Sequence, residues 1–451
     1  MKKFKYLFLS ATLVLNFIIS SDLSFAQSNN LTLYNMKSIP QANYLNPAIL
    51  PDCKFSIGIP ILSSFYLGLS HSGFAYDDLV RRRGDDSLYI DMDNVISKLK
   101  KTDNYFSFNS SIELFSLGIK FDKNYISLNG SERFSADITY PKDLLTLLWK
   151  GNKPFIGKEA EIDGLGINIM HYREIAGGYA REINDKWTVG TKLKLLFGKS
   201  NIYTAKSNMS LYTNPEDFTL TGNTNIVLNT SLKSGDESFS DYMFSGGDNL
   251  GFAMDLGGTF KLNDKFSFSA SIIDLGFIKW KNNVQNSVLD TNFVFNGVEF
   301  NYFKNDTTND IISEVGDLFK VTENNNSYKT TLPLKIFLSG NYTLNEKHVF
   351  GLLIRSEIVN GNFHPAFTGS YNRKLAKAFS FSLSYSIVNR SYLNLGAGFS
   401  TNGGPFQFYL ITDNFLSVIL PQSVKTFNIL CGMNLTFGRD KKKDVAQKSI
   451  D

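Results

Sequence analysis

The segment AFSFSLSYSIV, from Ala378 to Val388, alternates large apolar residues with small hydroxyl residues. The two sets occupy opposite parities: Phe379, Phe381, Leu383, Tyr385 and Ile387 against Ser380, Ser382, Ser384 and Ser386. Because successive side chains of a β-strand point to opposite faces, the pattern predicts a strand with one apolar face and one hydroxyl face. The apolar face could contact a protein core or lipid, and the rest of the sequence bears on that choice.

The same alternation recurs in segments 189–197, 265–272, 332–339 and 426–438. Strands of soluble sheets are usually about 5–6 residues long, whereas a strand that crosses a membrane needs about 9–11 residues. The alternating runs reach the longer value. We therefore interpret their apolar faces as lipid-facing and the serines as lumen-facing. A secreted β-sandwich or propeller is the alternative.

Short turns on one side and long loops on the other are typical of outer-membrane barrels. The turns Asn184-Asp185-Lys186, Asn263-Asp264-Lys265 and Asn345-Glu346-Lys347 each separate two patterned runs, and Asn and Asp favour tight hairpins. The predicted strands lie near 55–72, 105–122, 124–140, 166–183, 186–205, 248–263, 265–281, 330–345, 348–360, 365–376, 379–389, 392–400, 405–413 and 425–438. The sequence thus predicts an all-β fold, a transmembrane antiparallel β-barrel of about fourteen strands.

The predicted long loops are 73–104, 141–165, 206–247 and 282–329. In three of them the residue pattern predicts a short helix: one capped by Asp93 that runs through Leu99, one over 142–149, and one over 310–321. The third loop could instead contain an extra hairpin, because segment 219–232 is rich in β-forming residues.

The N-terminus has the order of a secretory signal peptide, with lysines, an apolar run from Tyr6 to Ile19, and small residues around Ala26. A membrane anchor is the alternative. We divide the chain into a signal peptide (1–26, cleaved near Ala26 after export through the Sec pathway), a periplasmic plug segment (27–53), the barrel (54–438) and a charged periplasmic tail (439–451). Removal of the signal lowers the formal charge of +4 by two, so the charge does not favour nucleic acid as a partner.

The segment between Met36 and Pro60 precedes the first strand and does not alternate. Its Asn46-Pro47-Ala48 resembles the hatch motif of the FadL-like family, the long-chain fatty-acid outer-membrane transporters, which are fourteen-stranded barrels. Segments 41–51, 274–280 and 435–438 also resemble an uncharacterised family of Bacteroidota outer-membrane proteins. The resemblance implies that Tyr44, Asn46 and Pro47 belong to a plug that gates the barrel.

The FadL-like resemblance implies a channel in the cell outer membrane for passive passage of small hydrophobic or amphipathic molecules. A non-transporting accessory of the PorV type, or a structural barrel, is the alternative. The expected partners are outer-membrane lipid, a small hydrophobic ligand, and surface or periplasmic proteins. The sequence has no His pair at metal-ligand spacing, no Cys-x-x-Cys and no Gly-x-Ser-x-Gly. We therefore predict no enzyme and no cofactor, although a Ser–His pair at the lipid edge remains an alternative.

Two sets of side chains are candidates for ligand contact. By parity, six charged residues should face the lumen, where they could fill the barrel with salt bridges or meet a ligand carboxylate: Lys192, Lys194, Asp255, Lys335, Arg355 and Glu357. An apolar patch at the predicted mouth could pack there or capture a hydrophobic ligand: Leu144, Leu148 and Trp149.

The two cysteines, Cys53 and Cys431, could form a disulfide in an oxidising compartment. Cys431 has the parity of the lipid-facing residues and lies seven residues before Gly438, about 23 Å up the strand at about 3.3 Å per residue. Cys53 should lie near the periplasmic rim. Because a disulfide needs Cα atoms within about 7 Å, we predict that both remain thiols.

Overall fold

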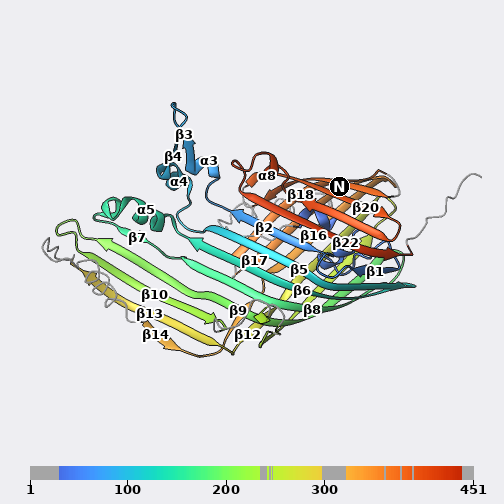
Figure 1. Cartoon of the computed structure of the whole chain (residues 1–451), viewed down its shortest axis with the longest axis horizontal. Coiled ribbons are helices and arrows are strands. Elements are labelled where there is room, and N and C mark those ends of the chain that lie inside the picture. Colours follow the sequence, from blue (N-terminus) through green and yellow to red (C-terminus); the bar gives the residue numbers. More distant parts are fainter. Residues whose placement is uncertain are drawn as a thin grey trace, which may run out of the picture.

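The computed structural model describes residues 30–233, 241–242, 245, 247–296, 321–359, 362–375, 378–388 and 391–438. Within them the chain forms a closed antiparallel barrel of fourteen strands (Figure 1). The predicted signal peptide, the charged tail and the helix over 310–321 lie outside the described residues.

The first barrel strand is interrupted and consists of β1 (Phe55–Gly58) and β2 (Phe65–His71). The other thirteen are β5 (Asn104–Phe121), β6 (Asn124–Tyr140), β8 (Gly166–Glu182), β9 (Trp187–Thr213), β11 (Asn249–Lys261), β12 (Phe266–Trp280), β16 (Leu334–Asn345), β17 (His348–Val359), β18 (Asn362–Lys374), β19 (Phe379–Val388), β20 (Ser391–Gly403), β21 (Phe406–Thr412) and β22 (Thr426–Phe437). The barrel closes where both β1 and β2 pair with β22 on one side and with β5 on the other. The predicted fold class and strand order are confirmed.

Strand β19 shows which way the two faces of the opening segment point. Leu383 and Tyr385 are 41% and 45% exposed on the outer surface, whereas Ser382 and Ser386 are fully buried. The large apolar residues of the neighbouring strands are exposed in the same way. The apolar face of the segment therefore lies on the outside of the barrel, and its serines face inward.

The short turns share one local mechanism. The side-chain oxygen of Asn184 accepts hydrogen bonds from the backbone N–H groups of Lys186 and Trp187, both at 2.9 Å. Asn263 and Asn345 accept the equivalent pairs of bonds in the turns before β12 and β17. Such a turn is formed by local side-chain to backbone bonds, which is why its sequence repeats.

The first strand departs from the prediction of one continuous run over 55–72. Proline has no N–H to donate to a ladder, and Pro60 lies in the gap between β1 and β2. The next residue, Ile61, has a positive φ of 68°. The chain turns there and re-enters the sheet at Phe65.

Strand β9 continues beyond the barrel and carries an extension of the same sheet on the long-loop side (Figure 1). Its upper half pairs with β10 (Leu220–Ser231), which pairs with β13 (Val284–Phe295), and β13 pairs with β14 (Val321–Asn324). The alternative of extra β structure in segment 219–232 is thus confirmed. Strands β13 and β14 were not predicted, nor were the short strands β7 (Glu159–Glu161) and β15 (Tyr328–Thr331).

The remaining elements are short. On the long-loop side lie α3 (Tyr76–Leu79), the hairpin of β3 (Val80–Arg82) and β4 (Leu88–Ile90), α4 (Met92–Lys98), α5 (Lys142–Lys150), η2 (Lys153–Phe155) and α8 (Leu416–Ile419). Helix α5 agrees with the prediction. The cap of α4 is Asp91, whose carboxylate accepts from the N–H of Asn94 at 2.9 Å. The prediction of Asp93 as the cap was wrong because the helix starts at Met92, two residues before the predicted start. Among the described helices, none is long and apolar enough to cross a membrane.

The N-terminal segment fills the barrel interior. It contains α2 (Leu31–Tyr34) and the 3₁₀ helix η1 (Pro40–Tyr44) and lies enclosed by the strands (Figure 1). Its apolar side chains, among them Leu33, Tyr34 and Ile39, share one buried cluster with wall residues such as Phe337 and Leu430. The core of the barrel at this level is therefore formed by the segment and the inner wall together.

Candidate functional site

The segment that fills the lumen, residues 31–53, is called the plug below. Its first turn is held by Asp413, which follows β21. The Asp413 carboxylate accepts hydrogen bonds from the backbone N–H groups of Leu31 and Thr32, at 3.2 and 2.8 Å. Asn428 of β22 holds the same carboxylate through a bond of 2.8 Å. The Thr32 hydroxyl lies 2.7 Å from that of Ser384 in the opening segment, so an inward serine of β19 contacts the plug.

A second contact joins η1 to the opposite part of the wall. The Tyr44 hydroxyl donates to the buried Glu113 carboxylate at 2.7 Å, and the amine of Lys192 lies 4.0 Å from the centre of the Tyr44 ring. Burial and, next, the Glu113 charge raise the pKa of Tyr44 well above its usual value. The phenol therefore keeps its proton and remains a hydrogen-bond donor. Gln41 and Asn434 of β22 add a reciprocal amide pair, with both bonds 2.9 Å long.

The Asn46-Pro47-Ala48 motif forms a tight turn against the wall. The Asn46 side-chain oxygen accepts from the N–H of Ala48 at 2.9 Å, and its amide donates to the Tyr34 hydroxyl at 3.1 Å. Gly190 of β9 and Gly257 of β11 are cross-strand partners beneath this turn. A Cβ at Gly257 would overlap the Asn46 side chain, and one at Gly190 would lie 2.5 Å from the Pro47 oxygen. The two glycines provide the room for the turn.

The bonding between plug and wall is different in kind from the bonding within the barrel. Among the described residues, every hydrogen bond from the plug to a barrel strand or to Asp413 involves at least one side chain, and backbone-to-backbone bonds to the wall begin only at Lys54. The barrel strands, in contrast, are joined by continuous ladders. The plug can therefore leave its position without breaking a ladder.

An ionic cluster lies in the lumen beside the plug. The amine of Lys194 is 2.8 Å from Asp255, 2.6 Å from Asp274 and 3.9 Å from Glu174. Asp274 also binds Lys335 at 2.8 Å. Arg133 of β6 adds a contact to Glu174 at 3.3 Å. Three of the six charged residues singled out from the sequence thus come together here, and Lys192 lies next to them on β9.

The alternation along β12 places Asp274 on the outer face, because Asp274 has the same parity as the outward Phe266, Phe268 and Ile272. It was therefore not among the predicted lumen residues. The register between β11 and β12 shifts at this point, and Asp274 has a positive φ of 65°. This bulge turns the Asp274 side chain inward, as extra residues in bulges do. The sequence did contain a signal for the inward position of Asp274, because it is a single carboxylate in an apolar run and a lipid-facing charge is costly.

The other two charged residues from the sequence lie on the neighbouring strand, where Glu357 is the cross-strand partner of Lys335. Arg355 and Glu357, both on β17, form an ion pair of 3.2 Å with almost no exposed surface. The apolar patch of Leu144, Leu148 and Trp149 lies on α5, which packs against α4 and β7. Leu148 and Trp149 are 74% and 53% exposed. The α5 patch therefore lies outside the lumen site.

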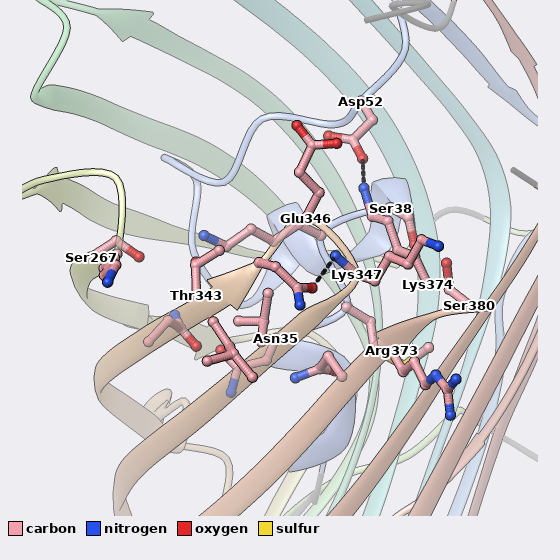
Figure 2. A pocket seen from close by; sticks show the side chains of 18 of the residues that line it. Asn35, Ser38, Asp52, Ser267, Thr343, Glu346, Lys347, Arg373, Lys374 and Ser380 are labelled. Atoms are coloured by element: carbon pink, nitrogen blue, oxygen red, sulfur yellow. Dashed lines mark hydrogen bonds and ion pairs between the residues drawn. The ribbon is translucent and has the colours of Figure 1, made fainter. Parts of the chain in front are cut away.

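Two hollows adjoin the plug. The inner one is a small cavity of about 60 Å³ between the plug residues Leu33, Gln41 and Tyr44 and the ionic cluster. The outer one is a vestibule of about 640 Å³ on the short-turn side, between Asn35, Lys37 and Asp52 of the plug and the ends of β16 to β19. Figure 2 shows plug residues Asn35, Ser38 and Asp52 facing wall residues such as Thr343, Arg373 and Ser380.

The vestibule carries more positive than negative side chains. Its cations are Lys37, Lys261, Lys265, Lys347, Arg373 and Lys374, and its acids are Asp52, Asp264 and Glu346. Lys261 pairs with Asp264 at 2.9 Å and Lys374 with Asp52 at 3.7 Å. The remaining cations leave the vestibule electropositive, which favours an anionic group at the short-turn end of the lumen.

The fold resembles solved outer-membrane channels at low sequence identity. One is the toluene transporter TbuX of Ralstonia pickettii, with 9% identity, coverage of 88% of this chain and 94% of that chain, and a TM-score of 0.44. A second is the toluene transporter TodX of P. putida, with 11% identity, coverage of 88% of this chain and 94% of that chain, and a TM-score of 0.40. A third is a FadL homologue of Pseudomonas aeruginosa, with 10% identity, coverage of 89% of this chain and 94% of that chain, and a TM-score of 0.40. No curated protein matches the chain.

The sequence profile of one protein family matches most of the chain. The matched region, residues 47–413, starts in the plug at Pro47 and ends at Asp413, which holds the first turn of the plug. The chain therefore belongs to this family of unknown function, DUF5723.

Proposed function

We propose that the protein is an outer-membrane channel whose plug gates the passive passage of small hydrophobic or amphipathic molecules. The observation that carries the proposal is the position of the plug between two hollows, without backbone-to-backbone hydrogen bonds to the wall among the described plug residues. In this arrangement the short turns face the periplasm, and the vestibule is the periplasmic exit.

The energetics of the plug support a gating role. A typical side-chain hydrogen bond contributes only about 0.5–1.5 kcal/mol net, because water replaces the partner when the bond opens. The wall partners of the plug are mostly hydroxyl and amide groups such as Ser384, Ser370 and Asn434. Water can satisfy these groups when the plug moves, so displacement leaves few stranded polar atoms.

The lining favours an amphipathic ligand. The inner cavity combines apolar side chains, including Leu33, Phe337 and Leu430, with the cations Arg133, Lys194 and Lys335 and the carboxylates of Glu113 and Asp274. The apolar side chains of the inner cavity suit an apolar body, and the electropositive vestibule suits an anionic end. We propose that Tyr44, Asn46 and Pro47 fix the closed position of the plug and that Lys192 and Lys194 meet the anionic end as the ligand passes.

A tether between plug and wall tests this function. In a variant with Cys53→Ser and Cys431→Ser, the pair Thr32→Cys/Ser384→Cys replaces two hydroxyls that lie 2.7 Å apart. We expect the oxidised tether to block uptake of a labelled long-chain fatty acid by a deletion strain, and reduction to restore it. The matched control is Thr368→Cys/Ser386→Cys, which joins two wall strands across 2.9 Å and leaves the plug untouched. Equal uptake with the plug tethered and released would contradict the proposal.

One observation favours the accessory alternative. The lumen is filled, and the sheet of β9, β10, β13 and β14 offers a contact face on the long-loop side (Figure 1). A protein partner recovered in stoichiometric amount with the purified barrel, together with uptake that does not change on deletion, would favour the accessory over the channel.

A further inference from the structure

Two lysines lie directly opposite each other on the outer face of the barrel. Lys279 of β12 pairs with Lys329 of β15 in register, while the next pair, Trp280 and Tyr328, stacks inward. Both lysines are exposed. Like charges placed directly opposite on one face of a sheet are destabilising. The pair is called the lysine patch below. Its repulsion suggests that another group compensates the two charges.

The lysine patch marks the upper end of the apolar band on β12. The outward residues below Lys279 are all apolar: Phe266, Phe268, Ala270, Ile272, Leu275 and Phe277. From Phe266 to Phe277 the strand rises about 28 Å at about 3.3 Å per residue and a tilt of about 40°. The outward apolar band of such barrels is about 25 Å tall. The lysines thus lie where the headgroups of the lipid leaflet on the long-loop side begin.

No carboxylate compensates the two charges within the described residues, where neither lysine forms an ion pair. The Lys329 amine lies 4.9 Å from the centre of the Phe277 ring, which holds it at the edge of the apolar band. Two neighbouring ammonium groups can both donate charge-assisted hydrogen bonds to one phosphate group.

Arg173 of β8 lies on the same level of the wall, where its guanidinium binds the Glu132 carboxylate at 2.5 Å. Arg173 of β8 pairs with Phe197 of β9, and Phe197 pairs with Leu250 of β11. The next residue, Gly251, pairs with Ile278 beside Lys279. Three strand spacings, about 15 Å in all, separate Arg173 from Lys279. Arg173 thus has its own counter-ion, whereas the lysine patch has none among the described residues.

We propose that Lys279 and Lys329 bind a phosphate group of a glycolipid in the outer leaflet of the outer membrane. The bound phosphate removes the repulsion between the lysines, and the acyl chains of the glycolipid lie along the apolar band beneath Phe277. This binding is independent of transport. It requires only that the long-loop side of the barrel faces the outer leaflet.

Titration of the purified barrel in detergent tests the proposal, with diphosphorylated lipid A, its dephosphorylated form and inorganic phosphate as three separate probes. We expect diphosphorylated lipid A to bind and the other two probes to bind at least tenfold more weakly. Each lysine near an anionic lipid surface contributes an energy that corresponds to about fivefold in affinity. The Lys279→Gln/Lys329→Gln variant should therefore bind about 30-fold more weakly, and Lys279→Arg/Lys329→Arg should retain binding.

The matched control removes two exposed lysines from the short turns, in Lys123→Gln/Lys186→Gln. All variants should show the same heat-dependent gel mobility, which reports a folded barrel. Unchanged affinity of the Lys279→Gln/Lys329→Gln variant, or an equal loss in the control, would overturn the proposal. Equal binding of the dephosphorylated lipid would overturn it as well, and so would equally tight binding of inorganic phosphate.

Discussion

At the scale of single residues, the position of the plug depends on a wall glycine that leaves room for it. Gly257 faces inward beneath Asn46, whereas the adjacent Gly258 faces outward, with no atom near the position of a Cβ. We expect Gly257→Val to displace the Asn46-Pro47 turn, because such overpacking costs about 1–3 kcal/mol. Gly258→Val is the matched control and should leave the turn in place.

Labelling of a buried residue in the same turn measures this displacement. Ala48 is 2% exposed, and Ala48→Cys in a background without Cys53 and Cys431 gives a single thiol. A cost of about 1–3 kcal/mol corresponds to about 5- to 150-fold faster reaction with a charged maleimide in Gly257→Val. Similar labelling rates in the Gly257 and Gly258 variants would mean that the turn does not rest on Gly257.

The native cysteines give a second prediction at this scale. Cys53 is buried at the end of the plug, and Cys431 lies half-buried on β22 opposite Phe65, with no disulfide between them. Alkylation of the unreduced, denatured protein should therefore add two groups by intact mass. A protein that gains two groups only after reduction would contradict this arrangement.

At the scale of one element, the two faces of β19 should respond differently to charge. Leu383→Arg places a cation in the outward apolar band, where Arg costs about 2–4 kcal/mol at the membrane midplane. Ser380→Arg places the same charge in the vestibule, which Ser380 lines. We expect a lower yield of heat-modifiable barrel for Leu383→Arg only. A normal yield for Leu383→Arg together with a loss for Ser380→Arg would reverse the assignment of the faces.

The plug limits which serines of β19 suit this comparison. Ser384 also faces inward, but its hydroxyl contacts Thr32, and only 5% of its surface is exposed. An Arg at position 384 would collide with the plug. The inward face of β19 is therefore solvated near the short turns and packed higher up.

At the scale of the whole molecule, the ionic cluster joins wall strands that are distant in sequence. Removal of one member of a buried ion pair typically costs about 3–5 kcal/mol, because it leaves an uncompensated charge. We expect Lys194→Met to lower the temperature at which the barrel loses its folded gel mobility. Lys261→Met, which breaks an exposed pair with Asp264, should change it little. Equal stability of the two variants would mean that the cluster does not hold the wall together.

The strands, the turns and the face of the wall on which most residues lie could be predicted from local sequence patterns. These features are local: alternation fixes the two faces of a strand, and Asn184, Asn263 and Asn345 form their turns with the next three residues. The fourteen-stranded barrel and helix α5 were predictable for this reason.

The change of phase in that alternation and the wall residues that hold the predicted plug depend on tertiary contacts. The bulge at Asp274 depends on pairing between β11 and β12, so parity along one strand placed that residue on the wrong face. The contacts of Thr32 with Ser384 and of Gln41 with Asn434 join residues more than 300 positions apart. No local pattern encodes such contacts, because they exist only once the barrel has closed around the plug.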